Sequence, residues 1–379
     1  MPVAWQLLSA ARINAVVQNF GVDPRLMPQQ LTFLNRTPIV PAADGDIMAR
    51  VTGYPTIADI IADDQQAVTY QNTKIQYDTT TIPNIKHGAP MTQAMLAELT
   101  AIEANGGGLP AGSMFAQYES MVLANLVLGV RQRMEALLVA MACDGLTYDR
   151  LGIKLTGVTW GMPSDLKVTT GTAWDNAGSA TPVADMLAVK LIGSVRYGIN
   201  YDRVTMSTQA FRYMVATTEF QNKARQYLAP NVSYANLNIA DLPAQKMIAQ
   251  NVLGMAIELY DARYFQQAAD GTLSSTPFLP ITKVILSSTA SDGNAMVQDF
   301  ANGVVVESQV ASLLGGSLSG LGGPQRGPVG YATADEGLNP PQITYWAVAR
   351  GFPRKKLFQA NAVLTVGTFS DAISATVPF

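Results

Sequence analysis

The sequence predicts a mixed α+β protein built around one long helix, and three observations support that fold class. Residues 113–143 keep apolar side chains at helical spacing, which predicts a helix about 45 Å long. Residues 181–310 alternate helix and strand patterns, as a mixed βαβαβ domain does. Only 14% of the 379 residues are charged, against about 25% in an average soluble domain. A compact monomer needs a charged surface, so we expect much of this surface to be covered.

Composition excludes several classes of protein. With one cysteine, Cys143, and one histidine, His87, the chain has no internal disulfide, no Cys-rich zinc site and no multi-histidine metal centre. A net charge of −3 argues against a dedicated DNA reader, which usually carries a basic face. The best apolar stretch, 121–143, contains several charged residues, so it predicts a soluble helix rather than a membrane span. The N-terminus lacks a basic region, so no secretory signal is expected. The low charge therefore points to self-assembly.

The first 88 residues predict extensions rather than a folded core. Residues 3–20 predict an apolar helix that ends at Gly21, and we interpret residues 1–37 as an arm that docks on another surface. Residues 38–88 contain alternating stretches such as 74–79, which predict strands. No long apolar run accompanies them, and a two-stranded ribbon without a core is marginal alone. We expect this ribbon to lie on a neighbour.

Helices and strands then alternate along the chain. Pro90 suits the first position of a helix over 90–104. Thr181 as N-cap and Pro182 as first residue start a helix that runs to about residue 197. Further helices are expected at 207–227 and 241–250, and strands at 153–158, 166–170, 203–206, 254–260, 281–287, 303–306, 342–350 and 361–369. Residues 315–330 form a Gly/Pro-rich loop, too long for a tight turn.

Motifs for catalysis or cofactor binding fail on inspection. The glycines of 315–330 lack the Lys-Ser/Thr pair of a phosphate loop and the third glycine of a dinucleotide fingerprint. His87 stands in a turn-like context, and Cys143 is expected to be a small buried hydrophobe. Acid pairs such as Asp63 and Asp64 are interpreted as solvated turn residues. We therefore expect no catalytic residue, no cofactor, no metal site and no enzyme activity.

One basic cluster remains, formed by Arg350, Arg354, Lys355 and Lys356. It has the charge to contact phosphates of an enclosed nucleic acid, or acidic residues of a neighbouring subunit. It lies beside predicted strands and lacks interleaved aromatic residues, so reading of a base sequence is not expected. We favour an inter-subunit or surface role.

Three groups of segments between residues 159 and 366 carry a resemblance to a known family. The first group is TWGMP (159–163), TGTAW (170–174) and ATPVADM (180–186). The second is IELYD (257–261), DG (270–271), FLP (278–280) and KVIL (283–286). The third is NPP (339–341), RGFP (350–353) and NAVLTV (361–366). In this order and spacing they resemble the major capsid proteins of tailed bacteriophages, in the lambda-like branch of the HK97 fold.

The resemblance implies an HK97-like capsid fold with four parts. These would be an N-terminal arm (1–37), an extended β-hairpin called the E-loop (38–88), a peripheral domain (89–180 and 335–379) whose spine helix covers about 113–143, and an axial domain (181–334). The implied function is self-assembly through hexamers and pentamers into an icosahedral shell around double-stranded DNA. The alternative is an encapsulin-like compartment shell that encloses a protein cargo. A third interpretation, an α/β enzyme, would have to use His87.

The resemblance also implies partners and contact residues. Expected partners are further copies of the chain, a portal protein, scaffolding or decoration proteins where they exist, and packaged DNA bound without sequence specificity, but no membrane. The expected location is the virion capsid, assembled in the host cytoplasm. Only about 37 residues precede the ribbon, so we expect a separate scaffolding protein or none, and crosslinking through Lys74 or Lys86 is not favoured. The expected inter-subunit contacts are Trp5, Phe20, Tyr54, Tyr70, Lys74, Tyr77, Arg350, Arg354, Lys355 and Lys356, and the flexible axial loop holds Gly315, Gly316, Gly322 and Gly323.

Overall fold

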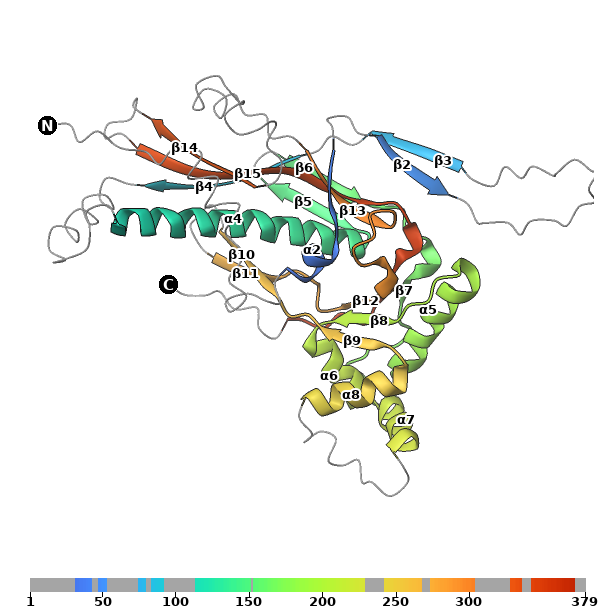
Figure 1. Cartoon of the computed structure of the whole chain (residues 1–379). Helices are drawn as coiled ribbons and strands as arrows, with labels where there is room; N and C mark the ends of the chain where they lie inside the picture. The colour runs from blue at the N-terminus through green and yellow to red at the C-terminus, as the bar shows by residue number, and fades with distance from the viewer. Residues whose placement is uncertain are drawn as a thin grey trace, which may run out of the picture.

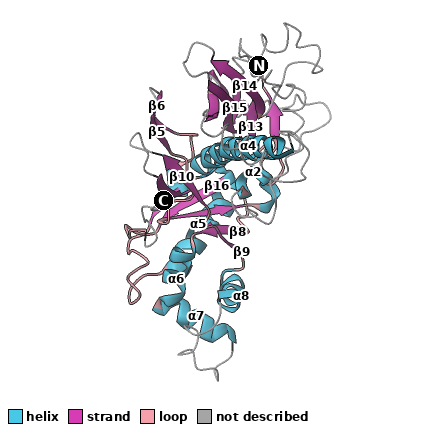
Figure 2. Ribbon diagram, turned by 90° about the vertical axis from the view of Figure 1, so that its left-hand side faces the viewer, coloured by secondary structure: helices cyan, strands magenta, loops and turns pink. Residues whose placement is uncertain are grey.

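A long helix between two sheets organises the molecule (Figure 1). The computed structural model describes residues 31–42, 47–52, 74–79, 83–91, 113–150, 153–228, 242–267, 273–303, 328–335 and 342–371. Helix α4 (Ser113–Ala142) lies below one sheet and above the other, and Figure 2 shows the same arrangement from the side. The predicted long helix is therefore confirmed, and it ends where Asp144 adopts a left-handed backbone conformation (φ 53°).

The first sheet is built around one long strand. Its order is β1-β13-β15-β14, and β4 also pairs with β15. The bounds are β1 Ile39–Pro41, β4 Asn84–Met91, β13 Gln298–Asn302, β14 Val329–Asp335 and β15 Gln342–Lys355. Alternate residues of β15, among them Tyr345, Ala347 and Ala349, face α4, whose Val130 and Met134 fill the layer between. This packing follows from the two-residue period of a strand and the 3.6-residue period of a helix.

The second sheet carries the lower helices. Its order is β7-β16-β12-β8-β9, with β7 Lys167–Thr169, β8 Arg203–Met206, β9 Ala256–Leu259, β12 Lys283–Ser287 and β16 Asn361–Thr365. Helices α5 (Pro182–Tyr197), α6 (Thr208–Ala216), α7 (Thr218–Leu228) and α8 (Leu242–Leu253) pack against it in the largest apolar core. A third cluster joins this sheet to α4 through Val139, Tyr260, Phe278 and Ile285.

Three two-stranded units complete the described structure. The strands β2 (Ile47–Thr52) and β3 (Lys74–Thr79) pair only with each other, as do β5 (Leu146–Arg150) with β6 (Ile153–Val158) and β10 (Arg263–Gln267) with β11 (Leu273–Pro277). In Figure 1 the β2–β3 ribbon lies beside the first sheet and away from the helices. This is the isolated antiparallel pair that the sequence predicts within 38–88.

The two ends of the predicted ribbon belong elsewhere. Strand β1 pairs in parallel with β13, and β4 pairs along β15. Pro90, predicted to start a helix over 90–104, lies in β4 opposite Thr344, so the predicted start is wrong, while residues 92–104 lie outside the described residues. His87, predicted in a turn, lies in the same strand opposite Ala347. Long-range strand pairing overrides the local preference of proline here.

The sheets also divide the chain differently from the predicted domains. Strand β13 and nearly all of β14 fall in the predicted axial segment 181–334, yet both pair with β15 of the first sheet. Strands β7 and β16, inside the predicted peripheral segments, belong to the second sheet. The helix expected over 207–227 is two helices, because Thr217 is extended and its Oγ1 accepts a hydrogen bond from the N–H of Phe220.

Candidate functional site

Residues 31–37, which connect the predicted arm to the body, are held by a buried carboxylate. Helix α2 (Thr32–Arg36) has no side-chain cap of its own. Instead, Glu135 of α4 accepts hydrogen bonds from the backbone N–H groups of Phe33 (2.9 Å) and Leu34 (2.6 Å). The hydroxyl of Tyr260 donates to the same carboxylate at 2.7 Å. Glu135 therefore replaces the missing N-cap from a different element of the fold.

Burial dominates the electrostatics of Glu135, whose side chain is fully buried. It raises the pKa of Glu135 from 4.5 to about 7, although the three hydrogen bonds and the charge of Arg36 act in the opposite direction. Burial, together with the neighbouring carboxylate, also raises the pKa of Tyr260. Near neutral pH the carboxyl group is therefore close to its midpoint of ionisation.

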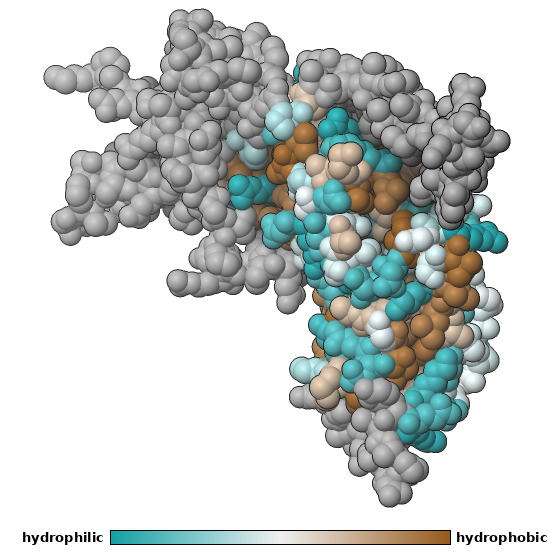
Figure 3. Space-filling view, turned by 45° about the vertical axis from the view of Figure 1, so that its right-hand side comes forward, coloured by the Kyte–Doolittle hydropathy of each residue, from teal (hydrophilic) through white to brown (hydrophobic). Residues whose placement is uncertain are grey.

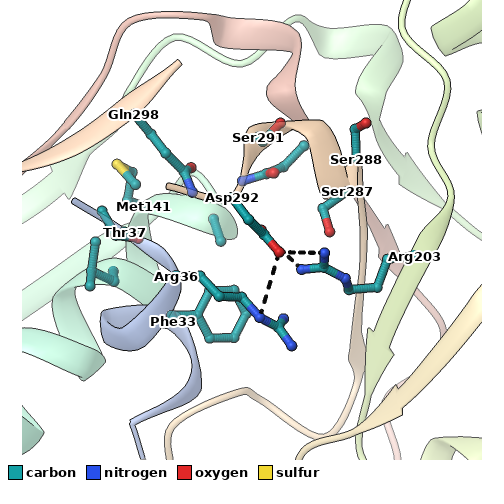
Figure 4. A pocket seen from close by; sticks show the side chains of 13 residues that line it. Phe33, Arg36, Thr37, Met141, Arg203, Ser287, Ser288, Ser291, Asp292 and Gln298 are labelled. Carbon is teal, nitrogen blue, oxygen red and sulfur yellow. Dashed lines mark hydrogen bonds and ion pairs between the residues drawn. The ribbon is translucent and has the colours of Figure 1, made fainter. Parts of the chain in front are cut away.

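A second set of contacts ties α2 to the lower sheet. Arg36 donates two hydrogen bonds to Glu258 of β9, at 2.6 and 2.5 Å. Its Nε also lies 3.9 Å from Asp292, which Arg203 of β8 binds at 2.6 Å. Figure 4 shows both arginines directed at Asp292 along the wall of a pocket. We call the residues Arg36, Glu135, Arg203, Glu258, Tyr260 and Asp292 the arm clasp.

The contacts of the arm clasp are better suited to fixing residues 31–37 to the body than to binding a ligand. Both arginines of the pocket are already paired with carboxylates, so neither offers an unpaired charge to an anion. Bidentate Arg–carboxylate pairs fix orientation as well as position. The arrangement therefore fixes where residues 31–37 leave the body, between α4 and the second sheet.

The predicted basic cluster is engaged within the chain. Arg354 and Lys356 both pair with the buried Asp299 of β13, each with one contact of 2.7 Å. Lys355, fully buried, faces the other side, where burial lowers its pKa to about 8. The prediction of Lys355 as an inter-subunit contact is wrong, because alternation along β15 turns it inward. Arg350 is half-buried, and its side chain lies over Gly303.

Most other predicted contact residues are not placed. Trp5, Phe20, Tyr54 and Tyr70 lie outside the described residues, as do the loop glycines Gly315, Gly316, Gly322 and Gly323. Lys74 and Tyr77 lie in β3, opposite Thr52 and Ala49 of β2. Their contacts with other subunits remain predictions.

His87 and Cys143, the two residues considered for catalysis, both pack against other parts of the chain. The ring of His87 lies so close to Gly129 of α4 that an added Cβ there would meet its Nδ1 at 2.4 Å. Cys143 is half-buried beside the cluster of Val139 and Tyr260, and burial raises its pKa to about 12. Within the described part of the chain, no group of three or more His, Cys, Asp or Glu residues gathers to hold a metal ion. No helix described here is both long and apolar enough to cross a membrane.

Comparisons with known proteins agree with this architecture. The model of a family described as phage major capsid protein E matches residues 50–300. A capsid protein assigned to a prophage of E. coli CFT073 is 14% identical over 95% of this chain and 99% of its own, with a TM-score of 0.59. The capsid of Myoviridae phage XM1 is 12% identical over 88% of this chain and 91% of its own, with a TM-score of 0.42. The SrpI encapsulin of Synechococcus elongatus PCC 7942 is 11% identical over 92% of this chain and 91% of its own, with a TM-score of 0.43. No curated protein sequence matches.

A long helix between two sheets, with a separate two-stranded ribbon, is the arrangement of the HK97-like capsid fold. The chain belongs to the phage major capsid protein E family. It is thus a structural protein of the phage capsid, an icosahedral shell. The predicted HK97-like fold and the resemblance to phage major capsid proteins are therefore confirmed. The lambda-like branch stays a prediction.

Proposed function

We propose that the chain assembles through hexamers and pentamers into a closed shell around double-stranded DNA, with no enzymatic step of its own. The observation that carries this proposal is the match of the capsid family over residues 50–300. Head-to-tail contacts within a ring bury different faces of each subunit and close by rotation. Many weak contacts of this kind stabilise a shell without any single strong one.

The β2–β3 ribbon supports this proposal. A two-stranded antiparallel pair is marginal in water unless one face packs against something. The ribbon pairs with no other described strand, so in the shell it lies across a neighbouring subunit. In this proposal, β1 and β4 anchor the two ends of the E-loop in the first sheet.

The arm clasp supports a role for the N-terminal arm. Because residues 31–37 are fixed to α4 and to the second sheet, a preceding arm starts from a defined point and reaches a fixed neighbour. Packaged DNA would be held without sequence specificity. Portal, scaffolding and decoration proteins would be the remaining partners, with assembly in the host cytoplasm.

The test is assembly of the purified full chain, followed by sedimentation velocity and negative-stain electron microscopy. We expect particles of megadalton mass with six- and five-fold capsomers. A 40.4 kDa monomer at every protein and salt concentration would refute the proposal. Virions should contain nuclease-protected DNA, whereas particles filled with a cargo protein would select the encapsulin-like alternative.

A variant of the β2–β3 ribbon tests its role in assembly separately. Val51 pairs with Ile75 in the middle of β2–β3, and proline there removes a donor and disfavours the pairing. Val51→Pro should leave the unfolding midpoint of the body unchanged and abolish shells. Shells of normal yield would show that the ribbon does not hold neighbours together.

A further inference from the structure

Helix α5 carries an apolar stripe on the face that points away from its own core. Leu187, Leu191 and Val195 follow one another at four-residue spacing and are 37%, 61% and 73% exposed. The inner face of the helix is formed by Val183, Met186, Val189 and Gly193. Figure 3, in which the side carrying α5 comes forward, shows hydrophobic side chains running down the lower body. A helix that is apolar on both faces is normally covered on both.

No charged residue interrupts the stripe, because the three charged residues of α5 turn to its flanks. Asp185 accepts a hydrogen bond from a neighbouring tryptophan at 3.1 Å. Lys190 donates to the carbonyl of Gly254 at 3.2 Å, and Arg196 donates to Asp165 at 2.8 Å. The other exposed residues on the outer face are Ala184, Ala188 and Ser194. The result is an apolar centre with a polar rim, the usual anatomy of a protein interface.

We propose that this stripe is an inter-subunit contact, covered in the shell by a second copy of this chain. The inference rests on the proposed function, because a shell made of copies gives every subunit the same kind of neighbour. With exposed fractions of 37%, 61% and 73%, the three residues expose roughly 300 Å², which is at the lower end of the size of the largest apolar patch on a typical monomer. That is well below the ~800 Å² per partner of a stable pair. The stripe therefore suits one of several contacts that form together.

The symmetry of a closed ring limits how the copy can meet the stripe. Contacts that close a ring are head to tail, so α5 of one subunit meets a different face of the next. A substitution on α5 then damages one contact per subunit, and that loss is repeated around every capsomer. Assembly should respond much more strongly than the folding of a single chain.

The first experiment places two negative charges in the stripe, with Leu191→Asp and Val195→Asp in one chain. The matched control, Asn222→Asp with Gln226→Glu, adds the same charge at the same spacing to exposed positions of α7. We expect the α5 variant to keep its unfolding midpoint and to lose at least 10-fold in shell yield, while the control assembles as wild type. Normal assembly of the α5 variant, or equal loss in the control, would overturn the inference. Failure of the wild-type chain to assemble would instead refute the proposed function.

The second experiment identifies the occupant by thiol protection. Leu191→Cys is made with Cys143→Ala, so that the stripe carries the single thiol, and maleimide labelling is followed before and after assembly of the purified chain. We expect labelling to slow at least 10-fold in shells only, which assigns the cover to a second copy. Protection already present in the unassembled chain would assign it to another segment of the same chain. Equal labelling in both states would show that no copy covers α5.

Discussion

Replacing Glu135 tests whether its carboxylate holds residues 31–37 to the body. Glu135→Ala removes the acceptor of three donors, namely the part-buried N–H groups of Phe33 and Leu34 and the buried hydroxyl of Tyr260. Each buried unsatisfied group costs about 1–3 kcal/mol, so we expect a loss of roughly 4 kcal/mol in unfolding free energy. Glu135→Gln keeps the shape but turns one acceptor into a donor, and should cost about 1–3 kcal/mol.

The pH dependence gives a sharper test of the same group. Its pKa rises from 4.5 in the unfolded chain to about 7 in the folded one, so between these values the folded state binds the extra proton. The stabilisation is complete below pH 4.5 and is lost as the pH rises through 7. The difference corresponds to roughly 3 kcal/mol. Glu135→Gln removes this contribution, because an amide does not titrate.

The assay is urea unfolding of the unassembled chain at pH 5 and pH 7.5, followed by tryptophan fluorescence. In Glu135→Gln, the fall in unfolding free energy between pH 5 and pH 7.5 should be smaller than in wild type by roughly 2 kcal/mol, because part of the titration lies below pH 5. The control is Glu219→Gln, whose carboxylate accepts the N–H groups of Val183 and Ala184 but is partly exposed. The same pH dependence in Glu135→Gln as in wild type would refute the reasoning.

Three further substitutions test the internal contacts. Asp299→Asn removes the buried charge with which Arg354 and Lys356 both pair and should cost about 3 kcal/mol; an unchanged urea midpoint would contradict this. Lys355→Met removes a buried amine that has no hydrogen-bond partner among the described residues, so stability should change by less than about 1 kcal/mol or increase, and a large loss by calorimetry would count against it. Gly351→Ala places a Cβ 2.2 Å from the ring of Phe300 and should lower stability by about 1–3 kcal/mol, whereas Gly145→Ala, with open space around it, is the control that must not show this clash.

Local periodicity predicted the elements that depend on local sequence. The helix expected over about 113–143 is Ser113–Ala142, because its apolar spacing is continuous and Asp144-Gly145 stop it. The start at Pro182 was predictable for the same reason, since Pro at the first helical position and Gly198 after the last are local signals. Pro90 failed because its strand pairs with β15, some 250 residues further on, and no local rule contains that partner.

The candidate site depended more on distant residues. Glu135 lies in a largely apolar stretch of α4, but its donors come from residues 101 to 125 positions away, so only the solitary acid was visible in the sequence. The burial of Lys355 was not visible in the basic cluster, because the strand predicted at 342–350 stops before it. Strand β15 extends to Lys355, where the alternation of side chains places Lys355 on the opposite side from Arg354.

The shortage of charge becomes more acute once the contacts are known. Four basic residues form ion pairs with carboxylates of the same chain, namely Arg36, Arg203, Arg354 and Lys356. A fifth, Lys355, is buried. The described surface therefore has fewer free charges than 14% of the sequence suggests, and on α5 it shows an uncharged stripe. The two kinds of contact separate by experiment: substitutions in the arm clasp or at Asp299 should lower the stability of the isolated chain. Substitutions on the α5 stripe should leave that stability intact and remove only the ability to join a neighbour.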